Sequence, residues 1–330
     1  MKTILLVTDN REDQVNGVVV TFSNIKKYAL EAGYDFKTIS PADFYHFSAP
    51  KYPEVKLSVP FSIGKKIKEI NPDYIHIATE GPIGVAAKIY CDIKKYKYST
   101  SYHTKFPEFM KELYNIPVWL GYAYLRWFHA KSSNVLTTTK SMKQLLIEKK
   151  FSAPIHTWSR GVDRDKLYSS IRRKKTDRIK VLYVGRVSKE KNLDDLCVLE
   201  NEFDIQIVGD GPYREELQEK YKNIEFVGYK KDGELADCYK MADVFCFPSK
   251  TDTFGIVLIE AMSLGLPVAA YPVTGPIDIV EPGVSGILGD SLADAIRQAA
   301  TLNRRQVEQS SQKWTWQQAW EIFSKHLEKK

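Results

Sequence analysis

The chain has 330 residues, of which 43% are hydrophobic and 27% charged. This composition excludes a disordered chain, a collagen-like chain and a disulfide-stapled miniprotein, and the length suffices for two domains with separate cores. The net charge of +7 is unevenly distributed. Residues 1–160 carry 23 Lys and Arg against 14 Asp and Glu, whereas residues 161–330 carry 25 against 27. We therefore expect an anionic or membranous partner for the first half and a small ligand for the second.

The sequence lacks several signals of other protein classes. The apolar run in MKTILLVTDN is too short for a signal peptide and predicts a buried strand. The longest uncharged run, residues 261–277, holds three prolines and two glycines and is too short to span a bilayer. The four cysteines have no C-x-x-C spacing, which indicates free thiols in a reducing compartment and argues against a zinc site. We expect a cytoplasmic protein.

Strand and helix patterns alternate along the first half. Apolar runs predict strands at residues 3–7, 36–39, 74–77, 98–103 and 135–138. Helices are predicted within residues 16–33, at 82–93 and 140–149, and along a stretch at 105–131. This alternation predicts a parallel sheet covered on both faces.

The pattern restarts after a polar, basic segment at residues 169–180. Strands are predicted at residues 181–184, 205–208, 224–227, 244–247 and 268–271, and an amphipathic helix at 314–329. The predicted domain boundaries are 1–160 for the first domain, 161–180 for a linker and edge, 181–310 for the second domain and 311–330 for a terminal helix. Ligands of open α/β sheets bind at the strand carboxyl ends, so we expect two doubly wound domains with the site in a cleft between them.

The segment SKTDTFGIVLIEAM after the predicted strand 244–247 has the strongest functional pattern. A helix that begins near Gly255 would offer free N–H groups and a positive dipole end to a diphosphate. Asp252 and Glu260 would hold hydroxyls, one on a sugar and one on a ribose. The structural alternative is that both are ordinary acidic residues near a helix start.

Two further loops follow predicted strands of the second half. In GRVSKEKN, Arg186 and Lys191 can neutralise phosphate charge, although a solvated basic turn would have the same composition. In VGDGP, Gly209 permits a tight turn and close backbone approach. The sequence contains neither G-x-G-x-x-G nor a P-loop motif, which disfavours a dinucleotide oxidoreductase and a P-loop nucleotidase.

In the first half, Gly17, Glu80 and His103 follow predicted strands and are expected near the ligand, although a single histidine is more often structural. The stretch 105–131 interleaves eight aromatic residues with four cationic ones, among them Lys105. Such a pattern suits a membrane interface with anionic lipids, and it also suits nucleic acid. The structural alternative is an ordinary pair of core helices with solvated lysines.

Together, the motifs VFCFPS, VGRVSKEKN, VGDGP, FVGY and EAMSLGLPV resemble those of retaining glycosyltransferases of family 4. That family has the GT-B fold, in which two Rossmann-like domains with doubly wound parallel sheets face each other across a cleft. The motifs IHIATEGPIG and TSYHTKFPE resemble a narrower branch, which contains enzymes that glycosylate diacylglycerol, sulfoquinovosyltransferases and α-mannosyltransferases.

The resemblance implies a role for each matching position. Arg186 and Lys191 would hold the donor diphosphate, Asp252 the transferred sugar, and Glu260 the ribose. His103 would lie beside the sugar and the acceptor. The expected catalytic residues are His103, Arg186, Lys191 and Asp252. Glu80 and Lys105 would lie on the acceptor side. The remaining donor-binding positions would be Gly17, Gly185, Gly209, Val227, Tyr229, Phe254, Gly255 and Ile256. The family usually has Glu where this chain has Asp252, so the resemblance does not determine which sugar is transferred.

The expected activity is transfer of a hexose from a nucleotide-sugar to a lipid such as diacylglycerol, by a protein peripheral to the inner membrane face. No metal or other cofactor is expected, because cationic side chains neutralise the leaving diphosphate. A polysaccharide, soluble or modified-DNA acceptor is the first alternative. A non-catalytic nucleic-acid-binding protein is the second, and the set of donor motifs argues against it. The oligomeric state stays open.

Overall fold

The computed structural model describes residues 1–14, 16–49, 52–171 and 177–330. The chain forms two compact units. Unit 1 combines Met1–Arg160 with Trp316–Lys330, and unit 2 is Gly161–Thr315. Residues 172–176 of the predicted linker lie outside the described residues.

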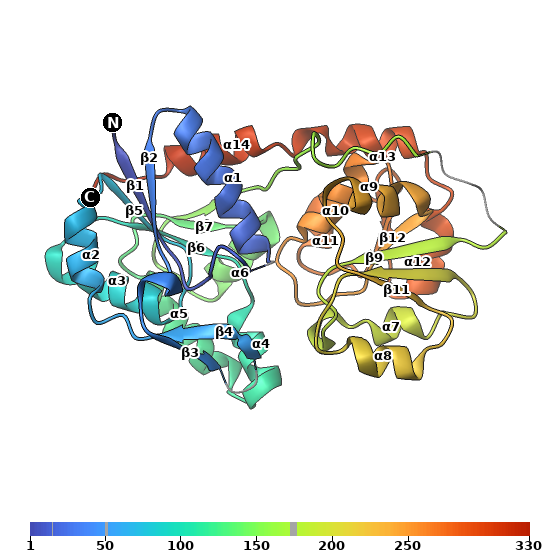
Figure 1. Cartoon of the computed structure of the whole chain (residues 1–330), viewed down its shortest axis with the longest axis horizontal. Helices are drawn as coiled ribbons and strands as arrows, with labels where there is room; N and C mark the ends of the chain where they lie inside the picture. The colour runs from blue at the N-terminus through green and yellow to red at the C-terminus, as the bar shows by residue number, and fades with distance from the viewer. Residues whose placement is uncertain (15, 50–51, 172–176) are drawn as a thin grey trace. The chain divides into compact units, whose positions relative to one another are not determined.

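Unit 1 is built on a six-stranded parallel sheet with the order β2-β1-β5-β6-β7-β8 (Figure 1). Its strands are β1 (Thr3–Val7), β2 (Asp35–Ile39), β5 (Tyr74–Ile77), β6 (Ser99–Tyr102), β7 (Val135–Thr137) and β8 (Ile155–Thr157). An antiparallel pair, β3 (His46–Ala49) and β4 (Tyr52–Ser58), is separate from this sheet. Its helices are α1 (Gly17–Glu31), α2 (Ile63–Ile70), α3 (Pro82–Lys94), α4 (Phe106–Tyr114), α5 (Val118–His129), α6 (Lys140–Glu148) and α14 (Trp316–Lys325), with a 3-10 turn at Pro41–Asp43.

Helix α14 packs into unit 1 beside α1 (Figure 1). The indole N–H of Trp158 donates a 2.8 Å hydrogen bond to the carbonyl of Ala319. The rings of Phe22, Trp158 and Phe323 are in mutual contact, with centroids 5.2 to 6.1 Å apart. The apolar face of the predicted tail helix is therefore buried in the core of unit 1.

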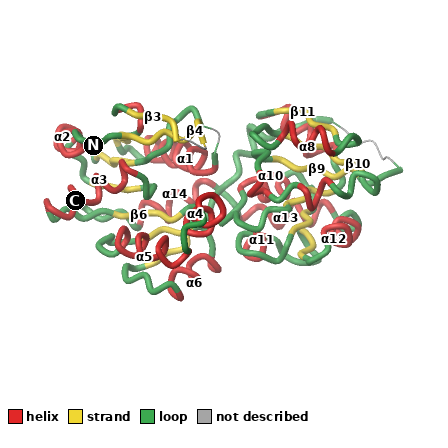
Figure 2. The backbone as a smooth tube through the Cα atoms, turned by 90° about the horizontal axis from the view of Figure 1, so that it is seen from below, coloured by secondary structure: helices red, strands yellow, loops and turns green. Residues whose placement is uncertain are grey.

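Unit 2 contains a second six-stranded parallel sheet, with the order β11-β10-β9-β12-β13-β14; Figure 2 shows its strands between helices. Its strands are β9 (Lys180–Val184), β10 (Asp204–Val208), β11 (Glu225–Gly228), β12 (Val244–Phe247), β13 (Val268–Ala270) and β14 (Gly286–Leu288). Its helices are α7 (Asp194–Cys197), α8 (Arg214–Lys220), α9 (Asp232–Met241), α10 (Ile256–Ser263), α11 (Pro276–Ile279), α12 (Leu292–Ala299) and α13 (Arg304–Ser310), with 3-10 turns at Lys189–Lys191 and Ser311–Lys313.

The two faces of this sheet bury separate apolar clusters. Leu182 and Phe245 pack on one face with α9, α10 and α13. Val181 and Tyr183 pack on the other with α7, α8 and α12. Because side chains alternate along a strand, a strand buried on both faces must be apolar throughout, which is the pattern seen in the sequence. The predicted class of two parallel-sheet α/β domains is confirmed.

The predicted helical stretch 105–131 forms a pair of helices, α4 and α5. Helix α4 ends at Asn115, which has a left-handed φ of 55°, and Pro117 precedes α5. A left-handed residue ends a helix because the chain can no longer make the next i to i−4 bond. The strands β3, β4, β8 and β14 were not predicted, and neither were the helices α2, α7, α8, α11, α12 and α13.

Candidate functional site

The strand order of unit 2 reverses between β9 and β12, which are neighbours in the sheet. In doubly wound sheets such a reversal opens a crevice at the carboxyl ends, where the loops diverge. The loop after β9 carries Lys191, and the loop after β12 carries Asp252. The fold thus places two of the predicted residues on the two sides of this point.

Lys191 and Asp252 are joined by an ion pair. The ammonium Nζ donates to both carboxylate oxygens, at 2.7 and 2.8 Å. Their loops are also connected by Asn192, which donates to the carbonyl of Pro248 at 3.2 Å, and by Thr251, which donates to the carbonyl of Glu190 at 3.3 Å. The structure therefore brings together a cation and a carboxylate that are far apart in the sequence, and hydrogen bonds between their two loops stabilise this arrangement.

The loops after β9 and β10 touch at their glycines. A Cβ on Gly209 would lie 1.9 Å from the carbonyl oxygen of Gly185, so only glycine fits this approach. Beside it, the buried Tyr183 hydroxyl donates to the carbonyl of Arg186 at 2.9 Å. The predicted diphosphate-binding segment is thus fixed through its backbone.

Helix α10 begins after Gly255, as predicted, and Gly255 has a left-handed φ of 86°. One turn into the helix, Glu260 accepts a 3.0 Å hydrogen bond from the hydroxyl of Tyr239, a fully buried residue of α9. Burial raises the pKa of Glu260, and the Tyr239 hydroxyl counteracts this shift. The Glu260 carboxylate is held in one orientation, rather than being an ordinary solvated acid at a helix start.

The other predicted donor-binding residues of unit 2 surround these loops. Phe254 is buried against Trp314, with ring centroids 5.5 Å apart, and Ile256 opens α10. Val227 is partly buried at the end of β11, whereas Tyr229 just beyond it is mostly exposed. An exposed aromatic ring at a strand end is available to stack on a base.

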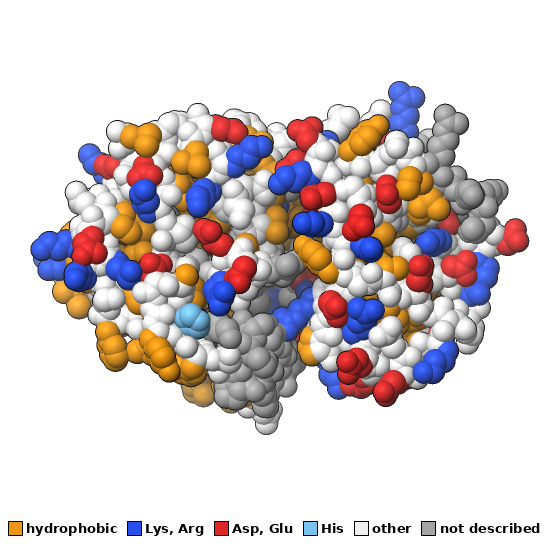
Figure 3. Space-filling model, in the orientation of Figure 1, with side chains coloured by type: hydrophobic (Ala, Val, Ile, Leu, Met, Phe, Trp, Pro, Cys, Tyr) orange, Lys and Arg blue, Asp and Glu red, His pale blue; other side chains and the backbone are white. Residues whose placement is uncertain are grey.

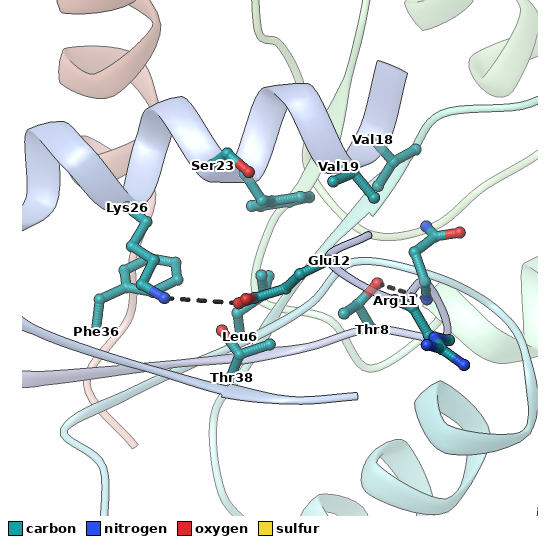
Figure 4. Close-up of a pocket in the computed structure, with 12 residues that line it drawn as sticks. Leu6, Thr8, Arg11, Glu12, Val18, Val19, Ser23, Lys26, Phe36 and Thr38 are labelled. Carbon is teal, nitrogen blue, oxygen red and sulfur yellow. Dashed lines mark hydrogen bonds and ion pairs between the residues drawn. The ribbon is translucent and has the colours of Figure 1, made fainter. Parts of the chain in front are cut away.

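In unit 1, Gly17 is the first residue of α1. The Oδ1 atom of Asn16 caps this helix by accepting from the backbone N–H groups of Val18 and Val19, at 3.0 and 2.9 Å. A cavity of about 40 Å³ lies between α1, β1 and β2, with Lys26 and Glu12 paired at 3.5 Å across it (Figure 4). None of the predicted site residues is among the described residues that line it.

His103 follows β6, and both of its ring nitrogens are engaged. Nδ1 accepts from the guanidinium of Arg160 at 2.9 Å, so the ring proton is on Nε2, which lies 2.8 Å from Ser101 Oγ. Burial, together with the charge of Arg160, lowers the pKa of His103 well below its ordinary value. His103 is therefore a neutral, fixed imidazole at neutral pH, and it is not poised to exchange a proton.

Arg160 was not predicted as a site residue. It is 3% exposed, donates to the carbonyls of Trp158 and Ser159, and stacks on the indole of Trp158 at 4.2 Å. In the sequence, Arg160 is marked only by its position in the segment RGVD, shortly before the basic segment 169–180. Its contact with a histidine 57 positions away depends on the fold.

Glu80 follows β5 and His103 follows β6, the neighbouring strand of the sheet. The two side chains nevertheless contact different residues. The Oε1 atom of Glu80 lies 3.4 Å from Nε2 of His129, at the end of α5. Tyr124 donates to the Glu80 carbonyl. Lys105 immediately precedes α4, so it lies in the chain directly after the His103 loop.

Asp9, which was also not predicted, supports this end of the sheet. Its carboxylate accepts from the N–H groups of Ile83 and Gly84 at the start of α3, at 2.8 and 3.3 Å, and from the Thr79 hydroxyl at 2.7 Å. Burial raises its pKa despite these bonds. An acidic residue directly after a buried strand was the available signal.

Helix α5 has both a buried and an exposed side. Tyr122, Leu125 and Phe128 belong to the core, whereas Trp119 is 68% and Trp127 46% exposed. Figure 3 shows hydrophobic side chains along the lower edge of unit 1, while the visible face of unit 2 mixes acidic and basic side chains. None of the helices in the described part of the chain is long and apolar enough to cross a membrane.

Solved structures define the class of this fold. The sucrose-phosphate synthase of Thermosynechococcus elongatus superposes with a TM-score of 0.78 at 17% identity, over 98% of each chain. HepE of Anabaena, in complex with UDP and glucose, superposes with a TM-score of 0.73 at 16% identity, over 98% of this chain and 99% of HepE. The fold is therefore that of a GT-B glycosyltransferase.

Sequence comparison identifies the family. The family model for glycosyl transferases group 1 matches residues 165–314, and the model for Glycosyltransferase Family 4 matches residues 15–166. The chain belongs to the family 4 glycosyltransferases, as the motifs predicted.

Three curated relatives lie in the predicted branch. The sulfoquinovosyl transferase of Arabidopsis thaliana is 29% identical over 83% of this chain, which spans only 60% of the plant protein. The GDP-mannose-dependent alpha-mannosyltransferase of Corynebacterium glutamicum is 28% identical, over 87% of this chain and 76% of the relative. The alpha-monoglucosyldiacylglycerol synthase of Streptococcus pneumoniae is 23% identical, over 81% of this chain and 70% of the relative.

Proposed function

We propose that this chain transfers a hexose from a nucleotide-sugar, of the UDP-glucose type or GDP-mannose, to a lipid acceptor such as diacylglycerol, with retention of the anomeric configuration. The observation that carries the proposal is the Lys191–Asp252 pair at the strand reversal of unit 2. One side of the pair suits a diphosphate and the other a sugar hydroxyl. Two of the relatives, a GDP-mannose-dependent alpha-mannosyltransferase and an alpha-monoglucosyldiacylglycerol synthase, support both substrates.

The proposed chemistry uses the charged groups of unit 2. As the bond between the anomeric carbon and the donor phosphate breaks, the phosphate takes the electron pair, and Lys191, Arg186 and the start of α10 stabilise its charge. The acceptor oxygen forms the new glycosidic bond on the same face of the sugar, and its proton passes to the leaving phosphate. In this proposal Asp252 holds the sugar hydroxyls and Glu260 the ribose. No metal is needed, because the two cationic side chains supply the compensating charge.

The lipid acceptor is supported by the surface of α4 and α5. Trp119 and Trp127 are exposed, and Lys111 and Lys131 lie on or beside the same helices. Aromatic rings with an apolar body and a polar edge, next to lysines, suit the interface of an anionic membrane. We therefore propose that the protein acts peripherally at the cytoplasmic face of a membrane.

The decisive experiment is a donor screen in which UDP-glucose, UDP-galactose, UDP-glucuronate and GDP-mannose are each incubated with diacylglycerol in mixed micelles, with mass-spectrometric detection of products. A hexosyl-diacylglycerol from one donor is expected. The lipid acceptor would be refuted in favour of a modified-DNA acceptor by three results together. No donor would give a product, the protein would bind duplex DNA tightly, and it would not sediment with anionic liposomes. Product formed only on a polysaccharide would refute it as well.

A further inference from the structure

Glu80 is held at the point where the strand order of unit 1 reverses, between β1 and β5. Tyr124 binds its carbonyl, and the adjacent Thr79 makes two 2.7 Å hydrogen bonds with Asp9. The Glu80 side chain is 15% exposed, although its Oε1 is fully buried. Part of this side chain therefore reaches the surface while one carboxylate oxygen points into the protein.

His129 lies behind that buried oxygen. It is 1% exposed and packs against the rings of Phe128 and Phe151, with centroids 4.9 and 5.6 Å away. Its Nε2 lies 3.4 Å from Glu80 Oε1, and among the described residues neither atom has any hydrogen-bond partner. The two atoms thus face each other in a site closed to water.

A chain of hydroxyls determines where the protons of His129 are. The Ser132 hydroxyl donates to the carbonyl of Asn134 at 2.7 Å, which is only an acceptor, and the Thr100 hydroxyl donates to Ser132 at 2.9 Å. With its own hydrogen used, Thr100 Oγ1 must accept from His129 Nδ1, which lies 2.8 Å away. The ring therefore always has a proton on Nδ1.

This assignment leaves Nε2 as a lone pair unless a second proton is present. A lone pair that faces a carboxylate oxygen in a dry site is repulsive, and a proton shared between Nε2 and Oε1 would remove that repulsion. Such a proton would tie the Glu80 carboxyl group to the ring and fix its orientation. The other carboxyl oxygen is then left as the group that a ligand can meet.

On the basis of the proposed function, we infer that Glu80 accepts the hydrogen bond of the acceptor's hydroxyl group, and that His129 is a positioning residue that orients it through this shared proton. A hydroxyl is the matching chemistry, because it can donate a hydrogen bond to the free carboxyl oxygen, whereas an ionised phosphate or carboxylate has no hydrogen to donate. The acceptor class is therefore a neutral molecule at its reacting end, such as a diglyceride or a sugar, rather than a phosphorylated one.

The shared proton is tested without any substrate. In the full-length protein with ¹⁵N-labelled histidine at pH 7, we expect His129 Nδ1 to be protonated in the wild type and in Glu80→Gln, and the Nε2 resonance to shift in Glu80→Gln. His156→Gln, which changes a histidine outside this network, should leave the His129 signals unmoved. An unprotonated Nδ1, or an Nε2 resonance that is the same in wild type and Glu80→Gln, would overturn the dyad.

The positioning role is tested by two amides of different length. Gln at position 129 reaches the Nε2 position and still donates to Glu80, whereas Asn donates only at the Nδ1 position, to Thr100. We expect His129→Asn and Glu80→Gln to raise the KM for diacylglycerol at least about tenfold, the loss of one hydrogen bond to a charged group, and His129→Gln to stay within about threefold. Binding of UDP or GDP, whichever matches the donor that the screen identifies, should be the same by calorimetry in all variants.

Equal KM values in His129→Asn and His129→Gln, whether both are normal or both are raised, would overturn the positioning role. If His129→Asn does not fold, Glu80→Gln decides, because a wild-type KM for diacylglycerol in that variant contradicts the acceptor contact. If the wild type transfers no sugar to any acceptor, the proposed function and the acceptor role fall together, whereas the NMR result still decides the dyad.

Discussion

Lys191→Met separates a structural role of the Lys191–Asp252 pair from a catalytic one. The ammonium lies 2.7 and 2.8 Å from the two oxygens, and both side chains are about a quarter exposed, at 22% and 25%. A partly solvated pair contributes only about 0.5 to 1 kcal/mol to stability, so its loss lowers the melting temperature of a unit of this size by about 1 to 4 °C. Loss of a group that stabilises charge in the transition state costs about 3 to 4 kcal/mol, or 10² to 10³ in kcat.

The assay measures kcat with the best donor and diacylglycerol, together with the thermal melt of the same sample. Lys189→Met is the matched control, because Lys189 lies in the same 3-10 turn but pairs with Glu216 at 3.2 Å on an exposed surface. We expect wild-type activity from the control. A Lys191→Met enzyme within tenfold of wild type, or one whose activity loss is matched by global unfolding, would refute the catalytic role.

Three further variants test other parts of the structure. Tyr239→Phe removes the hydroxyl that counteracts the raised pKa of Glu260. We expect the KM for the donor to rise about tenfold, and we expect the further rise of this KM at low pH to begin at a higher pH than in the wild type. An unchanged KM profile between pH 5.5 and 8 would contradict this. Asp9 has a raised pKa, so its contribution to stability is present below about pH 4 and is lost as the pH rises through the folded value. Asp9→Asn should therefore flatten the pH dependence of urea unfolding, and an unaltered slope would disprove the assignment. Trp119→Glu should reduce sedimentation with anionic liposomes about tenfold at unchanged stability. The control variant Tyr168→Glu, at an exposed position of unit 2, should sediment like the wild type. Equal sedimentation of the two variants would contradict α5 as the membrane contact.

The core strands could be predicted from the sequence because a strand buried on both faces is apolar at every position, as in β12. The strands β7 and β13 have only three residues each but lie in apolar runs, whereas β8 (IHT) contains two polar residues and β14 (GIL) begins with a glycine, so neither of these two was recognised. The position of the break at Asn115 was not predicted, because the aromatic pattern of the stretch continues on both sides of it.

The individual members of the candidate site were easier to predict than their partners. Lys191 and Asp252 each follow a strand, which the sequence reveals, but their contact depends on the order of strands in the sheet. The same holds for Arg160 and His103, which are 57 residues apart. His129 had no local signal at all, because a histidine at the end of an aromatic helix looks like any other packing residue.

The return of α14 to unit 1 makes unit 2 an insertion within unit 1. During synthesis, residues 161–315 leave the ribosome before residues 316–330, so unit 2 can fold while the core around Phe22 and Trp158 still lacks Phe323. Unit 1 thus begins first and is completed last. A fragment that ends at Arg160 would expose these rings, and an independently folding unit 1 requires its two separate segments to be joined.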